Sequence, residues 1–226
     1  PLFFLQSNAA IADPLWSRVL GDVYKRQIAG DGELGIGDSQ LSAHTVGTIS
    51  GWELNMEATN VAGEEDGLVL LDVESSLVDS QFSRIFSMSD SSSVGLRAVW
   101  SEVTMDDVTM TGWNDGIRCE SACTLYGTTL NAGGGGRNSG SALTCDGGSI
   151  HLQTVETSAS DIGIDLIEGQ VHIEDWTVDM THRTYGIQLA NDAYATIRNM
   201  PSYTSSGICL LYTSDAADEG LGVDLG

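Results

Sequence analysis

The feature that most constrains this chain is a glycine that recurs before an apolar residue at intervals of 20 to 28 residues. Gly47 opens the series, and the mean step over seven intervals is 160/7, or about 23 residues. Each repeat alternates polar and apolar residues in short bursts, which is typical of β-strands and not of helices. The later members of the series are Gly67, Gly95, Gly116, Ala142 (in the same role), Gly163, Gly186 and Gly207.

The second part of each repeat has a fixed spacing, in which apolar or small residues follow one another at steps of two, three and two. The predicted inward sets are Leu54-Met56-Thr59-Val61, Ser75-Leu77-Ser80-Phe82, Val103-Met105-Val108-Met110, Cys123-Leu125-Thr128-Leu130, Ile150-Leu152-Val155-Thr157, Val171-Ile173-Trp176-Val178 and Ala195-Ile197-Met200-Ser202. The step of three predicts a bend between two strands. The second bend residue is Asp79, Asp107, Gly127, Thr154, Asp175 or Asn199, mostly types that tolerate left-handed backbone.

A further strand begins at each repeated glycine, as in Gly163-Ile164-Asp165-Leu166, with its apolar residues inward. Three short strands per coil would stack about 4.8 Å apart around a continuous apolar column. We therefore predict an all-β fold over residues 47–208: a single-stranded right-handed parallel β-helix, or solenoid, of about seven coils with about 22–23 residues each.

This repeat pattern resembles the right-handed parallel β-helices of the pectin-lyase-like superfamily. The resemblance implies a carbohydrate-related role, because the superfamily includes polysaccharide lyases and hydrolases. The hydrolase motifs G-H-G and R-x-K are missing from the repeat region. Asp106 and Asp107 form a carboxylate pair, but they stand where a tight turn alone favours Asp.

The two ends of the chain are predicted to be translated sequencing-adaptor DNA. Residues 22–27 read D-V-Y-K-R-Q and residues 209–214 read C-L-L-Y-T-S, and their back-translations are almost reverse complements. We therefore expect 1–27 and 209–226 to be adaptor-derived and 28–208 to be an incomplete β-helix. The alternative for the first end is a secretory signal, since Pro1 to Ala12 resembles the tail of one.

The chain is strongly acidic, with a formal net charge of −23. Without the two ends, 9 − 3 = 6 basic residues, all Arg, and 32 − 6 = 26 acidic residues remain. Such a surface cannot neutralise phosphates, so we expect no nucleic-acid partner. No apolar run of about 18 residues exists in the sequence, so we expect no membrane span in it.

Catalytic candidates come from the lyase resemblance, which implies an Arg or Lys base and carboxylates on one outward strand. Arg97 and Arg118 should project outward from neighbouring first strands, with Asp165 two coils further on. The alternative is a solvated row of side chains. A second candidate site lies where two long connections, 83–94 and 131–141, leave the same corner beside Trp113, Asn114 and Asp115. Arg137 and Asn138 lie in the second connection and complete this candidate ligand site.

Metal candidates fall into two groups. His151 and His172 should stack on neighbouring coils, although two imidazoles without a third ligand make a weak site. Asp66, Asp115 and Asp161 should share one corner, where oxygen ligands suit Ca²⁺. Their spacing matches no defined calcium loop. We expect no other cofactor.

Three cysteines lie in the repeats. Cys119 and Cys145 should face one another on neighbouring coils, which suits a disulfide, and Cys119 to Cys123 is the rival pairing. Either disulfide implies an oxidising compartment, and three buried free thiols remain the alternative.

These observations predict a monomeric, non-enzymatic, secreted or cell-surface β-helix module with a structural, adhesive or glycan-binding role. Its partners would be extracellular polysaccharide or cell-surface components. The alternative is a carbohydrate-active enzyme of the polysaccharide lyase or hydrolase kind, with its site on an outward β-face or between the two long connections.

Overall fold

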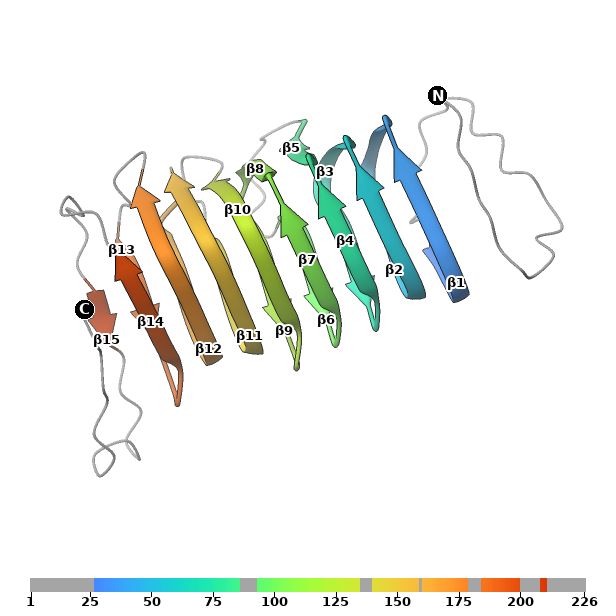
Figure 1. The fold of residues 1–226 in the computed structure, drawn as a ribbon. Coiled ribbons are helices and arrows are strands. Elements are labelled where there is room, and N and C mark those ends of the chain that lie inside the picture. Colours follow the sequence, from blue (N-terminus) through green and yellow to red (C-terminus); the bar gives the residue numbers. More distant parts are fainter. Residues whose placement is uncertain are drawn as a thin grey trace, which may run out of the picture.

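The computed structural model confirms an all-β parallel β-solenoid of about seven turns (Figure 1). It describes residues 27–85, 93–134, 140–158, 160–178, 184–199 and 208–210. The two predicted adaptor-derived ends therefore lie outside the described residues, apart from Gln27, Cys209 and Leu210. The strands are β1 (Gln27–Gly37), β2 (Gln40–Glu57), β3 (Asn60–Leu71), β4 (Glu74–Val78), β5 (Gln81–Arg84), β6 (Val94–Val99), β7 (Glu102–Asp106), β8 (Val108–Trp113), β9 (Asp115–Glu120), β10 (Thr124–Gly134), β11 (Ser141–Ser158), β12 (Ile162–Val178), β13 (Tyr185–Leu189), β14 (Tyr194–Asn199) and β15 (Ile208–Leu210).

All of these strands pair in parallel within one continuous sheet that wraps around the solenoid axis. The three short strands predicted for each coil are separate in the middle of the molecule, as β6, β7 and β8. In β11 and β12 they run on as single long strands of 18 and 17 residues. We call the three segments of a coil its first, second and third strands, starting from the repeated glycine.

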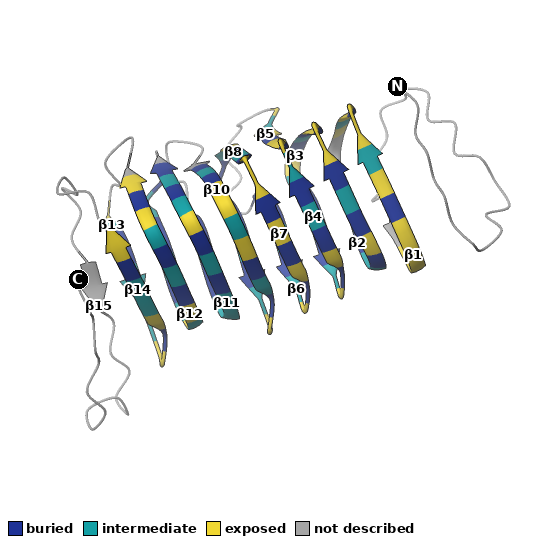
Figure 2. Cartoon of the chain, in the orientation of Figure 1, coloured by how far each residue is buried: buried dark blue, intermediate teal, exposed yellow. Residues whose placement is uncertain are grey.

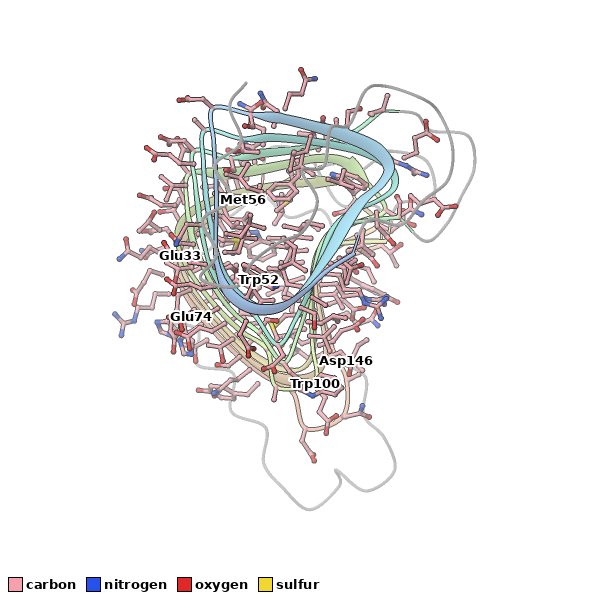
Figure 3. All side chains as sticks on the ribbon, turned by 90° about the vertical axis from the view of Figure 1, so that its right-hand side faces the viewer. Glu33, Trp52, Met56, Glu74, Trp100 and Asp146 are labelled. Carbon is pink, nitrogen blue, oxygen red and sulfur yellow. A yellow bond between two sulfur atoms is a disulfide. The ribbon has the colours of Figure 1, made fainter. Side chains whose placement is uncertain are left out.

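The interior is a set of apolar columns in which equivalent residues of successive coils stack (Figure 2). Leu54 pairs with Ser75, Ser75 with Val103, and Val103 with Leu125. A view along the axis places Trp52 and Met56 inside the coil and the glutamates Glu33 and Glu74 outside it (Figure 3). Alternation of inward apolar and outward polar residues thus produces the core, as the period of two predicts.

The solenoid begins one coil before the first predicted repeat. In β1, Leu34 pairs with Leu54 and Ile36 pairs with Met56, so this segment continues the inward columns. This segment lies within the β-helix predicted for 28–208, but the repeat register begins only at Gly47 because glycines occupy several positions here, and two of these, Gly30 and Gly32, lie against the ring of Trp52.

The predicted register was wrong by two residues in one coil. Gly127 pairs with Met105 and Leu152, so it occupies an inward position instead of the bend. Thr128 is exposed, and the bend residue is Thr129, which pairs with Thr154. The glycine concealed the register because it has no side chain: a Cβ there would lie 2.6 Å from a methyl carbon of Leu152.

The repeated glycine has a steric cause. A Cβ on Gly67 would lie 2.2 Å from the carbonyl oxygen of Gly95, and a Cβ on Gly95 would lie 2.7 Å from that of Gly116. The buried ring of Trp113 also lies against Gly63, Gly67 and Gly95. Glycine therefore recurs because the backbone of the next coil and one large ring fill the space of a side chain.

Left-handed backbone occurs along the whole solenoid at the corner between the first and second strands. At the corner between the second and third strands it occurs only in the early coils. Between first and second strands, left-handed residues include Gly51, Asp72, Trp100, Ser121, Gly147 and Asn191. Between second and third strands, they are Asp38, Ala58, Asp79 and Asp107. The prediction of left-handed bends is thus confirmed at Asp79 and Asp107. It is wrong at Thr154, Asp175 and Asn199, which have no positive φ, and at Gly127, which is not a bend residue. At Thr154 and Asp175 the bend forms within the long strands β11 and β12.

Candidate functional site

The outward row of the first strands contains the residues singled out by the lyase resemblance. Arg97 pairs with Arg118, Arg118 with Thr144, and Thr144 with Asp165. We call this surface, formed by β6, β9 and the first strands of β11 and β12, the first-strand face. The alternation of inward Leu96, Ile117 and Ile164 with these residues directs the polar side chains outward.

The two arginines are held by carboxylates of the same face. Arg97 donates two hydrogen bonds to Oε2 of Glu120, at 3.0 Å from Nε and 2.8 Å from Nη2. Nε of Arg118 lies 3.4 Å from Oε1 of Glu120 and 3.8 Å from Oδ2 of Asp115. Glu120 therefore lies between two guanidinium groups that would otherwise repel each other on neighbouring coils.

Asp165 stands two coils from Arg118, so the distance between the two backbones is about 10 Å. Burial raises the pKa of its carboxyl above the ordinary value, and the charge of Asp115 raises it further. Its Oδ1 atom is buried and has no hydrogen-bond partner. The catalytic candidates therefore share one face, but Arg118 and Asp165 do not form a contact pair.

Carboxylates outnumber guanidinium groups on the first-strand face. Arg97 and Arg118 are its two cations. Five acidic residues lie on the same face: Asp115, Glu120, Asp146, Asp165 and Glu168. The first-strand face therefore carries a net negative charge, as does the whole chain.

An exposed tryptophan, which the sequence analysis did not single out, lies at the end of this face. Trp100 follows β6, its side chain is 64% exposed, and its backbone N–H donates to the carbonyl oxygen of Glu120 at 3.4 Å. Figure 3 places it at the same corner as Asp146. Its φ of 51° is unusual for a bulky residue, whereas glycine, Asp, Ser and Asn occupy this corner in other coils. A tryptophan at a corner where other coils have turn-forming residues is the feature by which the sequence could have indicated this residue.

The second candidate ligand site is only partly described. The ring of Trp113 is completely buried in the core, so it cannot stack on a ligand. Asn114 is buried too, and its backbone N–H donates to Ser93 Oγ at 3.1 Å. Asp115 Oδ1 accepts from the N–H of Ser141 at 2.9 Å. Arg137 and Asn138 lie outside the described residues.

The aspartates proposed for Ca²⁺ follow one corner but belong to every second coil. Asp66 and Asp115 both pair with Val94, which lies between them. Asp66 Oδ1 accepts from the N–H of Val94 at 3.3 Å, so both carboxylates bind the backbone of the following coil. Asp161 is a further two coils along, and its carbonyl accepts from Tyr185 at 3.2 Å. Among the described residues, no three His, Cys, Asp or Glu side chains gather as metal ligands.

His151 and His172 do pair on neighbouring coils, with ring centroids 6.2 Å apart. Each Nε2 already has a partner: Ser149 Oγ at 2.9 Å for His151, and Glu174 Oε1 at 2.9 Å for His172. Tyr126 stacks on His151 at 5.5 Å, which extends the row to three aromatic rings. The arrangement is an aromatic row with its own hydrogen bonds.

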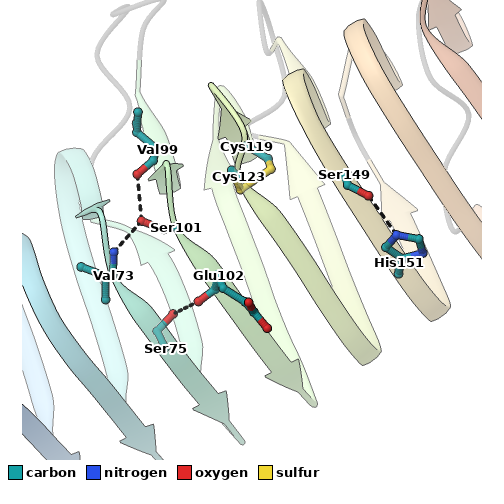
Figure 4. The surroundings of a disulfide bond; sticks show 9 residues. All are labelled: Val73, Ser75, Val99, Ser101, Glu102, Cys119, Cys123, Ser149 and His151. Carbon is teal, nitrogen blue, oxygen red and sulfur yellow. Dashed lines mark hydrogen bonds between the residues drawn. A yellow bond between two sulfur atoms is a disulfide. The ribbon is translucent and has the colours of Figure 1, made fainter.

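Of the two cysteine pairings, the structure contains Cys119–Cys123, with Cα atoms 5.4 Å apart (Figure 4). Cys145 is a buried free thiol, although it pairs with Cys119 on the neighbouring coil.

The fold and this site define a parallel β-helix with a mixed aromatic and charged outer face. The chain matches no protein-family model, no curated protein and no solved structure. In the part of the chain that the structure describes, no helix is long and apolar enough to span a membrane.

Proposed function

We propose that this chain is a non-enzymatic β-helix module that binds a neutral glycan on the first-strand face. The observation that carries the proposal is Trp100, a largely exposed residue whose backbone N–H bonds the carbonyl oxygen of Glu120, the ion-pair partner of Arg97. Aromatic rings stack on the apolar faces of sugars, and neighbouring charged groups hydrogen-bond sugar hydroxyls.

The backbone at Trp100 supports a role beyond folding. A left-handed conformation costs an ordinary residue about 1–2 kcal/mol relative to Gly or Asn. A bulky ring in this conformation gains no burial in return, because most of its surface is exposed. Strain without a packing benefit is frequent where a side chain contacts a ligand.

Charge selects the class of glycan. An anionic polysaccharide would meet five carboxylates and two arginines that are already engaged by Glu120 and Asp115. The net charge of −23 would repel a polyanion at longer range as well. Neutral hydroxyl groups, in contrast, can donate to the carboxylates without a charge penalty.

The direct test is Trp100→Asn in binding measurements on immobilised neutral glycans. Loss of the ring should weaken binding about tenfold, equivalent to about 1.4 kcal/mol. The same change should raise the urea midpoint, because Asn tolerates the left-handed corner. Binding and stability therefore move in opposite directions, which misfolding cannot imitate.

Tyr126→Asn is the matched control, since Tyr126 is an exposed aromatic residue of the second-strand surface. It should leave binding unchanged. Retained binding by Trp100→Asn together with loss in Tyr126→Asn would place the glycan elsewhere and overturn the proposal.

A polysaccharide lyase or hydrolase is the second candidate, favoured by the raised pKa of Asp165, whose Oδ1 is buried without a partner. A group of this kind can act as a general acid. The ion pairs of both arginines argue against it, because Glu120 and Asp115 already occupy the guanidinium groups that a lyase would turn toward its substrate. Turnover of an acidic polysaccharide with Ca²⁺, abolished by Arg118→Ala, would favour the enzyme.

An extracellular or cell-surface location is part of the same proposal. The Cys119–Cys123 disulfide supports it, because disulfides persist in oxidising compartments. A monomeric state and the absence of a required cofactor also remain proposals, and Ca²⁺ titration of glycan binding would test the latter.

A further inference from the structure

Three cysteines meet at the interface between two coils. Cys119 is the next-to-last residue of β9, and Cys123 immediately precedes β10, after a turn that contains the left-handed residues Ser121 and Ala122. Cys145 pairs with Cys119 one coil further on, and all three side chains are buried. Paired Cα atoms on neighbouring strands are about 4.8 Å apart, which is within the range of a disulfide.

One glycine lies next to both the disulfide and the free thiol. A Cβ on Gly148 would lie 2.8 Å from Sγ of Cys119, so this sulfur extends toward the coil that contains Cys145. The backbone of Gly148 also hydrogen-bonds the thiol of Cys145. Both sulfur atoms therefore lie next to the same residue, and a side chain at this position would crowd Sγ of Cys119.

The surroundings of Cys145 shift the pKa of its thiol in two opposite directions. Burial raises the pKa of the thiol, and this is the largest effect. Backbone hydrogen bonds from Gly148 and Gln170 lower it and stabilise the negative sulfur. A thiolate formed here has two hydrogen bonds, and the disulfide cysteine Cys119 is its paired residue on the neighbouring coil.

We propose that Cys145 exchanges with the disulfide, so that the chain interconverts between Cys119–Cys123 and Cys119–Cys145. The thiolate sulfur of Cys145 attacks Sγ of Cys119, the new bond forms, and the bond to Cys123 breaks. Cys123 leaves as a thiolate and takes up the proton that Cys145 released. One disulfide and one thiol are present before and after the step, so it requires no oxidant or reductant.

The exchange changes what the covalent bond connects. The Cys119–Cys123 bond spans four positions of sequence and closes a single corner. A Cys119–Cys145 bond would span 26 positions and join two coils directly. The longer loop restricts the unfolded chain more, so the inter-coil form should resist unfolding better.

The experiment uses the full chain with Cys209→Ser, which removes the fourth cysteine. The folded protein is incubated at pH 6, 7 and 8, quenched in acid, unfolded and labelled with a thiol reagent. Cleavage after Glu120 and after Tyr126 then places the three cysteines on separate peptides for mass spectrometry. We expect label on Cys145 first and then on Cys123, with a rate that rises about tenfold per pH unit while the thiol is mostly protonated.

Two variants keep the test decisive. Cys145→Ser should retain Cys119–Cys123 with no label on Cys123 at any pH. Cys123→Ser, oxidised in the folded state, should form Cys119–Cys145. Two free thiols in oxidised Cys123→Ser would show that the sulfurs cannot meet. Label confined to Cys145 after long incubation at pH 8 would likewise overturn the proposal.

Discussion

One outward row of the second strands is acidic in the early coils and uncharged in the later ones. Glu33, Glu53, Glu74 and Glu102 pair with one another in succession. The row continues as Thr124, Ser149, Gln170 and Tyr194. Beside this later part lie the stacked rings of Tyr126, His151 and His172.

The corner between second and third strands changes along the solenoid as well. In the early coils it uses left-handed residues, and the hydroxyls of Ser39, Thr59 and Ser80 bond the carbonyl oxygen two residues earlier. In the later coils Asn199 bonds Asp175 through side chains at 2.6 Å, and β12 runs through the bend. The difference shows that the repeat constrains the interior, whereas corners and outer rows have several solutions.

The prediction with the largest expected effect concerns whether the early and the later coils, the two halves of the solenoid, share one core. Leu54 and Leu125 occupy the same inward column, one in each half, and both are completely buried. Leu54→Ala and Leu125→Ala should each reduce the free energy of unfolding by about 2–5 kcal/mol. Urea denaturation measures both, and a cost below this range in one half alone would mean that the halves are packed differently.

The corner difference predicts unequal results from the same substitution. Asp79 has a φ of 48°, whereas Asp175 lies in extended backbone. Asp79→Val should cost about 1–2 kcal/mol, because a β-branched residue is strained in the left-handed region. Asp175→Val should remain within about 0.5 kcal/mol of the parent. Equal costs in thermal unfolding would contradict the distinction between the corners.

The glutamate row predicts a gain in stability. Like charges directly opposite on neighbouring strands destabilise a sheet, so Glu53→Gln or Glu74→Gln should stabilise by about 0.2–1 kcal/mol in low salt. About 1 M NaCl should remove the gain through screening. Ser149→Gln is the control in the uncharged part of the row and should show no salt-dependent change. A gain that persists in high salt would exclude electrostatic repulsion as its cause.

The smallest effects concern pH and two carboxyls of β12. The pKa of Asp165 is raised mainly by burial, so its folded form binds a proton more tightly than the unfolded form. The stability that Asp165 contributes is therefore present at pH values below its unfolded pKa of about 3.9, and it is lost as pH rises through the folded pKa. Asp165→Asn should remove this decline in urea midpoints measured from pH 3 to 7.

The pKa of Glu174 shifts in the opposite direction, because its hydrogen bond with His172 lowers the pKa of the carboxyl. The stability that Glu174 contributes is present at pH values above the ordinary pKa of a glutamate, and it is lost as pH falls through the folded pKa. Glu174→Gln should therefore flatten the acid side of the same curve. Identical pH profiles for the two variants would show that these shifts do not contribute to stability.

The sequence alone determined the interior. A column such as Leu54, Val103 and Ile150 must face inward, since the period of two and the step of three leave no other register that buries them. The repeated glycines also follow from sequence, although their steric cause, the backbone of the next coil, does not. Among the described residues, the predicted register failed at Gly127, where no side chain marks the face, and glycines concealed the register of the coil containing β1.

Tertiary structure decided the surface and the choice among partners. Cys123 and Cys145 are both within reach of Cys119, and only packing selects one of them. Trp113 and Trp100 look alike in sequence, but one fills the space left by glycines and the other lies exposed at a corner. The physical reason is that burial acts on every inward residue in the same way, whereas each outward residue depends on neighbours contributed by other coils.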